Sequence, residues 1–197
     1  MLDSARATNK EQEVRSVPEF PLEAGPCLIR PWRRSDKSAL VKHADNRRIW
    51  LNLRDVFPHP YTAKDADAWL AHVAEQDPVT SFAIAMDAEA VGGIGLLLGT
   101  DIHRLSAEVG YWLGEGVWGR GIATAALRVF TPWALESFGL ERLWAGVFST
   151  NPASMRVLEK AGYVREAVLR CAVVKDGDLL DQVIYATVRL SDRPSVG

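Results

Sequence analysis

The chain is poor in cysteine, with only Cys27 and Cys171 among its 197 residues. Two cysteines this far apart form no CxxC motif, and two are too few for a disulfide-rich scaffold. Both stand among apolar residues, where a cysteine commonly acts as a small buried hydrophobic side chain. We therefore expect two buried thiols rather than a disulfide.

Histidine is also sparse, and its spacing excludes the common histidine-based metal sites. The four histidines show no HExxH or other ligand spacing: His43, His59, His72 and His103. We therefore predict no metal site. The G-x-S-x-G turn that carries the nucleophile of many hydrolases is missing as well, so the sequence does not favour a serine hydrolase.

No segment is long and apolar enough to span a membrane, and the polar first twenty residues contain no apolar core of a secretory signal. The formal net charge is -2, so the chain lacks the basic excess that is typical of nucleic-acid-binding proteins. We expect a cytoplasmic protein that binds neither membrane nor nucleic acid. Its length and its 48% hydrophobic residues suit one domain with a full core.

The order of the predicted elements indicates one α/β domain at residues 27–190, after a flexible N-terminal arm at 1–26 and before a C-terminal tail at 191–197. The proline-bearing segment 54–62 is predicted to be a loop, with Thr62 as the N-cap of the helix that follows it. The expected strands are 27–32, 81–86, 91–98, 106–113, 142–149, 163–174 and 179–190, and the expected helices are 36–44, 63–75, 121–138 and 152–161.

Two glycine patterns overlap before the helix at 121–138. Gly114, Gly116 and Gly119 spell G-x-G-x-x-G, the motif of a dinucleotide-binding turn, whereas Gly119, Gly121 and Ala123 spell G-x-G-x-A. A dinucleotide fold needs an acidic residue at the end of the next strand to hold a ribose, but that strand ends in "FSTN". A P-loop is excluded because no Lys-Ser or Lys-Thr follows the glycines.

The second pattern fits its context better. Gly119 and Gly121 remove side chains where the backbone bends and approaches a ligand, and Ala123 keeps the first helical turn small. The free N–H groups of residues 119–124 then form an anion site suited to a diphosphate, to which Arg120 and Thr124 can add a charge and a hydroxyl. A glycine-rich turn that binds nothing remains the alternative.

The stretch "WGRGIATAAL" (118–127), followed by "NPASMRVLEKAGY" (151–163), resembles the GCN5-related N-acetyltransferase (GNAT) superfamily, and its RimJ/RimL-like branch most. The similarity covers residues 27–190. Trp118 departs from the Gln or Arg that usually opens the family's loop. The resemblance implies an α/β GNAT fold, with a mixed and largely antiparallel sheet whose splayed strands form an acetyl-CoA cleft.

The resemblance also implies which residues bind acetyl-CoA. Strands 108–113 and 143–149 are expected to splay around the pantetheine arm, and the loop before the helix is expected to hold the diphosphate. Asn151 is expected to reach the pantetheine amides, or to cap its own helix, or both. The implied cofactor-binding residues are Tyr111, Trp112, Leu113, Trp118, Gly119, Arg120, Gly121, Ile122, Ala123, Thr124, Asn151 and Ser154.

Two side chains are the implied catalytic candidates. Glu108 matches the region of the family's glutamate base, and a carboxylate beside an apolar cleft is suited to accept a proton; a solvent-facing glutamate is the alternative. Ser154 is expected to face the sulfur, or to be an ordinary first-turn helix serine. Many relatives carry a tyrosine acid where this chain has Leu158, which shifts the weight onto Ser154 or water.

The resemblance therefore implies an N-acetyltransferase that moves the acetyl group of acetyl-CoA directly to a primary amine, on a protein N-terminus or a small molecule. The alternative is a non-catalytic acyl-CoA-binding or regulatory module, and Leu158 favours it. The acceptor pocket is expected from residues 45–62 and the final hairpin. A homodimer is compatible with this branch, although no sequence pattern indicates one.

Overall fold

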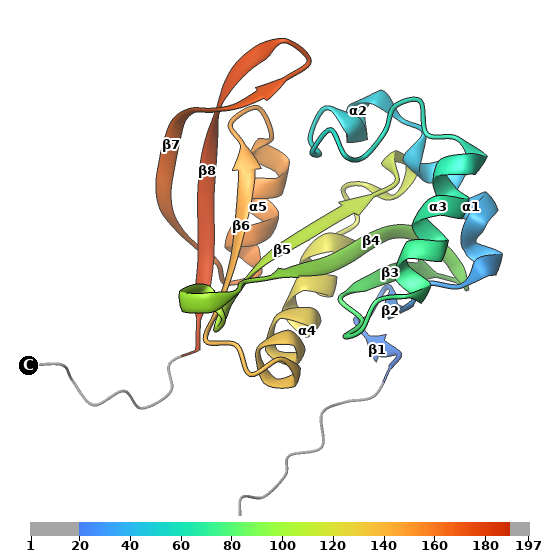
Figure 1. Ribbon diagram of the computed structural model, residues 1–197, viewed down its shortest axis with the longest axis horizontal. Helices are drawn as coiled ribbons and strands as arrows, with labels where there is room; N and C mark the ends of the chain where they lie inside the picture. Colours follow the sequence, from blue (N-terminus) through green and yellow to red (C-terminus); the bar gives the residue numbers. More distant parts are fainter. Residues whose placement is uncertain (1–19, 190–197) are drawn as a thin grey trace, which may run out of the picture.

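The structure is a computed structural model, and it describes residues 20–189 (Figure 1). Its strands are β1 (Leu22–Glu23), β2 (Leu28–Pro31), β3 (Ser81–Met86), β4 (Glu89–Leu98), β5 (Ser106–Leu113), β6 (Arg142–Phe148), β7 (Val164–Lys175) and β8 (Asp178–Val188). Its α-helices are α1 (Lys37–Ala44), α2 (Arg47–Trp50), α3 (Ala63–Ala74), α4 (Ile122–Ser137) and α5 (Pro152–Lys160).

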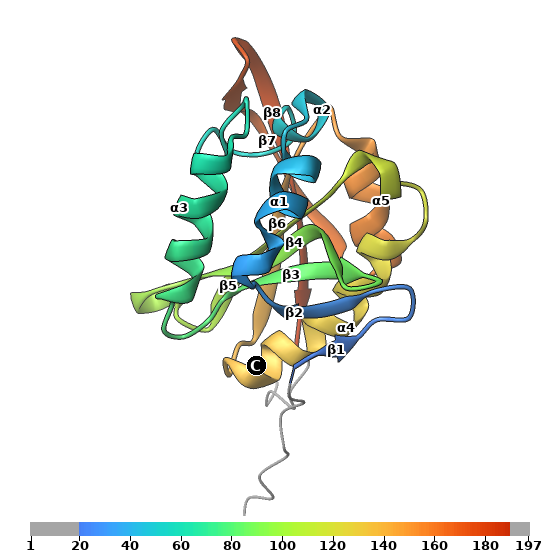
Figure 2. The ribbon, with the colours of Figure 1, turned by 90° about the vertical axis from the view of Figure 1, so that its right-hand side faces the viewer.

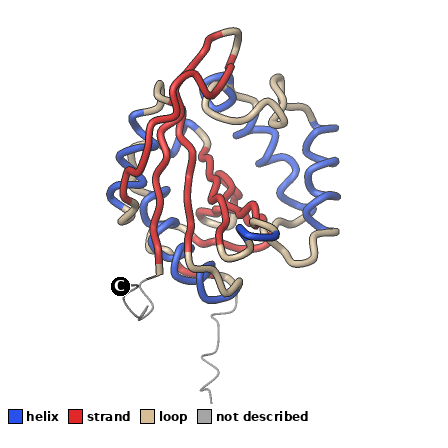
Figure 3. The backbone as a smooth tube through the Cα atoms, turned by 60° about the vertical axis from the view of Figure 1, so that its left-hand side comes forward, coloured by secondary structure: helices blue, strands red, loops and turns tan. Residues whose placement is uncertain are grey.

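The strands form one mixed sheet in the order β1-β2-β3-β4-β5-β6-β8-β7. The only parallel pair within the described residues is β5 with β6, and the other neighbours run antiparallel. Helices lie on both sides of the strands (Figures 2 and 3). This is the mixed, largely antiparallel α/β sheet that the sequence predicted.

Two apolar clusters hold the helices in place. One joins α4 to the sheet through Phe130, Leu127 and Ile122, which are fully buried against strand residues such as Phe82 and Leu143. The other cluster joins α1 to α3, and its buried members are Leu40, Ala44, Tyr61, Ala66, Leu70 and Val73. The second cluster fixes the loop before α3 as well, because Tyr61 belongs to that loop.

β5 and β6 separate after a short paired segment. Their register pairs only Ser106 with Arg142, Ala107 with Leu143 and Glu108 with Trp144, and beyond Glu108 the two strands diverge (Figure 1). The backbone edges beyond that point are left without a neighbouring strand. The sheet therefore opens between β5 and β6, as the sequence predicted for strands 108–113 and 143–149.

The helix ends follow the capping residues in the sequence. Thr62 and Asp65 form a capping box at the start of α3. The C-terminal ends of α4 and α5 are both followed by a left-handed glycine, Gly139 and Gly162. The paired bonds Gly139 N–H to Glu136 and Leu140 N–H to Leu135 make the end of α4 a Schellman motif.

Three features differ from the sequence-based expectations. β1 falls inside the predicted arm: Leu22 and Ala24 are buried, and Phe20 stacks on Phe82, so the folded domain begins before residue 27. The helix α2 was not predicted. Cys27 is buried as expected, but Cys171 is exposed. Residues 1–19 of the predicted arm and the predicted tail 191–197 lie outside the described residues.

Among residues 20–189, no helix combines the length and the apolar character that crossing a membrane requires.

Candidate active site

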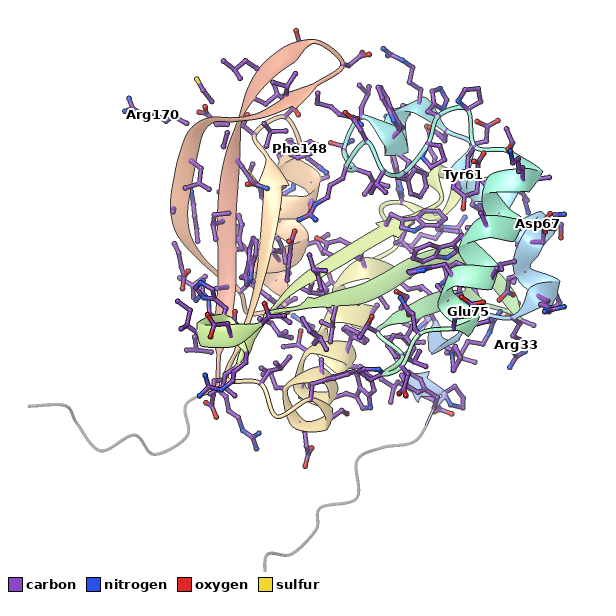
Figure 4. The ribbon with its side chains drawn as sticks, in the orientation of Figure 1. Arg33, Tyr61, Asp67, Glu75, Phe148 and Arg170 are labelled. Atoms are coloured by element: carbon purple, nitrogen blue, oxygen red, sulfur yellow. The ribbon has the colours of Figure 1, made fainter. Side chains whose placement is uncertain are left out.

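A cleft of about 1160 Å³ opens where β5 and β6 diverge. Figure 4 labels residues on opposite sides of it, Phe148 at the end of β6 and Tyr61 in front of α3. Every cofactor-binding and catalytic residue predicted from the sequence lines this cleft, from Glu108 on β5 through the 118–124 loop to Ser154 on α5. The sequence-based set therefore comes together in one place.

The start of α4 lies on this cleft and has the features of an anion site. Gly119 and Gly121 adopt left-handed backbone conformations, with φ of +75° and +76°, and a Cβ on either would meet open space. Among the described residues, no side chain caps α4, because its N-cap is Gly121. The first N–H groups of the helix therefore lack intrahelical partners and are free to bind an anion such as a diphosphate.

Basic side chains line the same cleft. Arg120 belongs to the loop, and Arg156 and Lys160 reach the cleft from α5. Arg156 and Lys160 were not predicted as site residues, although their four-residue spacing places them on one face of α5 together with Ala153 and Val157. Their charges favour a ligand with several phosphate groups.

Trp118 fixes the loop in front of α4. Its indole N–H donates a hydrogen bond to the Leu113 carbonyl at the end of β5, over 2.8 Å. The Arg48 guanidinium lies over the ring, 5.3 Å from its centroid. Trp118 therefore ties the loop to β5 through its side chain. This contact gives the tryptophan a structural role at the position where the family usually has Gln or Arg.

The exposed edge of β5 offers backbone groups to the opening. The Gly114 N–H donates to the Val91 carbonyl, and the Gly99 N–H donates to the Ser106 carbonyl. These two bonds show that the even-numbered residues of β5 point their backbone groups toward β4. Because backbone groups alternate along a strand, those of Tyr111 and Leu113 point toward β6 and the cleft. The backbone of Trp112 turns toward β4 instead, so this residue faces the cleft through its indole ring.

Glu108 stands at the last paired position before the strands diverge, and its side chain is 15% exposed. One carboxylate oxygen lies 2.5 Å from a guanidinium nitrogen of Arg54, which belongs to the loop before α3. Arg54 falls in the segment 45–62 that was expected to form the acceptor pocket, but its ion pair with Glu108 was not predicted, because two residues more than fifty positions apart leave no local pattern. The Glu108 carboxylate therefore stabilises a cationic nitrogen placed beside it.

Ser154 lies in the first turn of α5. Its N–H donates to the Asn151 side-chain oxygen over 3.1 Å, so Asn151 caps the helix, one of the roles considered above. Its hydroxyl is 2.8 Å from the Tyr111 hydroxyl. Burial raises the pKa of Tyr111 well above its ordinary value, which keeps the phenol protonated. Leu158 is fully buried and does not reach the cleft.

The comparisons with known proteins agree with this geometry. The family model described as "Acetyltransferase (GNAT) domain" matches residues 27–164. The chain is 34% identical over 120 residues to Probable N-acetyltransferase YjcK of Bacillus subtilis (strain 168), an alignment that covers 60% of this chain and 66% of that protein. The alignment thus spans just under two thirds of this relative.

Solved structures share the fold. The structure of Mycobacterium smegmatis RimJ in complex with CoA-disulfide has a TM-score of 0.75 and 27% identity, with 85% of each chain covered. RimL, described as the ribosomal L7/L12 alpha-N-protein acetyltransferase in complex with coenzyme A, has a TM-score of 0.75 at 19% identity, with 85% of this chain and 96% of that one covered. Because the family model matches more than half of the chain, this chain belongs to the GNAT acetyltransferase family.

Proposed function

We propose that this protein is an acetyl-CoA-dependent N-acetyltransferase that passes the acetyl group directly to a primary amine while both substrates are bound. One observation carries the proposal: the uncapped start of α4 and the carboxylate of Glu108 line the same cleft, between the diverging strands β5 and β6. The cleft thus provides an anion site and a proton acceptor for two substrates that meet between them.

Acetyl-CoA supplies an activated acetyl group on a thiol leaving group. The N–H groups at residues 119–124 bind the diphosphate, while Arg120, Arg156 and Lys160 add positive charge around it. The backbone edge of β5 at Tyr111, together with the Leu113 N–H, offers hydrogen bonds to an extended arm, as an added strand would receive. The Leu113 carbonyl already accepts the Trp118 indole N–H. Binding of both parts orients the acetyl group in the opening.

Glu108 acts as the base. An ammonium group cannot attack a carbonyl, so its proton must leave before or during the transfer. The carboxylate already holds the Arg54 guanidinium, and the arriving ammonium takes that place. Arg54 is 57% exposed, so its side chain can turn into water when the amine binds.

Ser154 stabilises the departing thiolate by donating a hydrogen bond to the sulfur, and water supplies the proton that converts the thiolate to the thiol. The Tyr111 hydroxyl lies 2.8 Å from the Ser154 hydroxyl and 3.3 Å from the Ser154 carbonyl. When the phenol donates its proton to the serine oxygen, the serine proton is free to point into the cleft. Tyr111 is therefore a positioning residue for Ser154. This pair takes over the place of the family's tyrosine acid, whose position is occupied here by the buried Leu158.

Leu158, which stands in the place of the family's tyrosine acid, favours a second candidate function: a module that binds acyl-CoA without turnover. The two functions are separated by mixing the protein with acetyl-CoA and a panel of primary amines, and measuring acetylated product by mass spectrometry. A thiol dye is unsuitable because it would also react with the exposed Cys171. Product formation supports the enzyme; binding of acetyl-CoA without product across the panel supports the module and contradicts the enzyme.

A further inference from the structure

We propose that the acceptor is a primary amine joined by a short linker to an aromatic ring. The inference rests on the proposed function and concerns the half of the cleft opposite α4. Five rings line that half, and we call them the aromatic wall: Trp32, Phe57, Tyr61, Trp69 and Trp112. So many large apolar side chains around one opening match an apolar ligand body.

The rings of the wall are held in place before any ligand arrives. The Phe57 ring lies 5.1 Å from that of Tyr61 and 5.6 Å from that of Trp112, between centroids. Tyr61 is 5% exposed, and it belongs to the cluster that joins α1 to α3. A preformed pocket of this kind binds its ligand without the cost of ordering the side chains.

The floor of this half of the cleft is made of glycines. On the face that carries Trp112 and Glu108, the sheet register pairs Gly95 with Gly110 and Gly93 with Trp112. A Cβ on Gly110 would meet no atom within 4 Å. Gly93 and Gly95 are closely covered by Trp112 and by the Thr80 carbonyl, so the open space lies over Gly110. The missing side chain of Gly110 leaves room for a ligand between the Trp112 ring and the Glu108 carboxylate.

The spacing along β5 sets the length of that ligand. Glu108 and Trp112 are four residues apart, which is about 13 Å along a strand. A hydrogen bond of about 3 Å at the carboxylate and a ring contact of about 4.5 Å at Trp112 occupy the two ends. The remaining length matches a two-carbon linker between an amine nitrogen and the centre of a ring.

The charged residues in the half of the cleft opposite α4 can balance the charge of one ammonium group. Besides Tyr61, its charged or titratable lining residues are Arg48, Arg54, Asp65, His72 and Glu108. Asp65 is engaged in the Thr62 capping box, and Arg48 pairs with Glu115. Glu108 is therefore the carboxylate available to the amine, and its contact with Arg54 shows that it stabilises a cationic nitrogen. A polyamine would bring further charges that this half does not balance.

An arylalkylamine can come from two sources, a free small molecule or the first residue of a peptide. The experiment compares kcat/KM for 2-phenylethylamine, tryptamine, ethylamine and spermidine, and for two short peptides that begin with Phe or Ala. We expect the aromatic amines to exceed ethylamine and spermidine at least ten-fold. A preference for the Phe peptide over the free amines assigns the ring to a peptide; the reverse assigns it to a small molecule. Both results support the inference.

The variant Gly110→Leu fills the floor, and Gly116→Leu is its matched control. Gly116 does not line the cleft, its φ is not positive, and a Cβ there meets open space. We expect Gly110→Leu to lower the ratio of kcat/KM for 2-phenylethylamine to that for ethylamine at least ten-fold, and Gly116→Leu to leave this ratio unchanged. A ratio of rates is insensitive to a general loss of active protein.

The outcomes separate this inference from the proposed function. Turnover that favours spermidine, ethylamine or the Ala peptide overturns the aromatic acceptor and leaves the acetyltransferase intact. An unchanged ratio in Gly110→Leu overturns the placement of the ring on the glycine floor. Binding of acetyl-CoA with no turnover of any amine overturns both proposals.

Discussion

At the scale of single residues, Glu108 shows what the sequence can and cannot predict. Its place on a strand follows from the alternation of Val109, Tyr111 and Leu113. Its ion pair with Arg54 does not, because that contact joins a strand to a loop and depends on the packing of α1 and α3. The chemistry of the carboxylate was thus predictable, but its cationic partner was not.

The substitution Glu108→Gln tests the base. The amide keeps the shape of the side chain but cannot accept the proton, so we expect kcat to fall about 100-fold, within the range of general base catalysis. The dissociation constant for acetyl-CoA should stay within about two-fold, because Glu108 lies away from the anion site. Steady-state kinetics and calorimetry measure the two effects. Equal kcat for both proteins at every pH would remove Glu108 from the mechanism.

The substitution Tyr111→Phe tests the positioning of Ser154. Burial raises the pKa of Tyr111, so the phenol stays neutral at every pH below its ordinary value of about 10, and its loss cannot change a titration in that range. We expect kcat to fall about 10-fold, with KM for acetyl-CoA unchanged and the pH profile between 6 and 9 keeping its shape. Ser154→Ala should show at least the same loss. A profile that shifts in Tyr111→Phe would instead make the phenol a titrating acid.

At the scale of elements, capping residues and periodicity predicted most of the helices and strands. Thr62, Asn151, Gly139 and Gly162 each stand where a helix begins or ends. β1 and α2 were missed because two to four residues carry no period, and each forms only where the rest of the domain packs against it. Local sequence fixes the long elements, whereas tertiary contacts decide the short ones.

The substitution Gly121→Glu tests the start of α4. It places an L-residue at a φ of +76° and brings a negative charge to the N–H groups that we propose bind the diphosphate. We expect acetyl-CoA binding to weaken beyond detection by calorimetry, with the fold retained by circular dichroism. Gly116→Ala is the control, since Gly116 belongs to the competing G-x-G-x-x-G pattern and has no positive φ. Loss of binding in Gly116→Ala alone would favour that other pattern.

A buried ion pair joins β2 to the segment before α1. Two Arg30 nitrogens each lie 2.8 Å from an Asp36 oxygen, and both side chains are about 5% exposed. Arg30→Met removes one partner and leaves a buried carboxylate, so we expect the free energy of unfolding to fall by about 3–5 kcal/mol. Urea denaturation measures it. The double variant with Asp36→Leu should recover part of the loss; a single variant as stable as the parent protein would contradict this role.

At the scale of the whole molecule, the opening between β5 and β6 brings together segments that lie far apart in the chain. The cofactor half could be predicted, because its residues fall in two compact stretches, 118–124 and 151–163, that resemble a known family. The acceptor half was predictable only in part. The expected segment 45–62 lines the cleft and supplies Phe57 and Tyr61, but the final hairpin contributes little more than Gln182. The other rings come from separate places, Trp32 after β2, Trp69 on α3 and Trp112 on β5. Only the folded chain assembles them.

The most direct measurement of the central claim is a crystal structure of the protein with acetyl-CoA. The account predicts the diphosphate within hydrogen-bond distance of the backbone N–H groups at residues 119–124, and the acetyl group between Glu108 and Ser154. A nucleotide bound at any other surface, with the start of α4 facing only solvent, would contradict it.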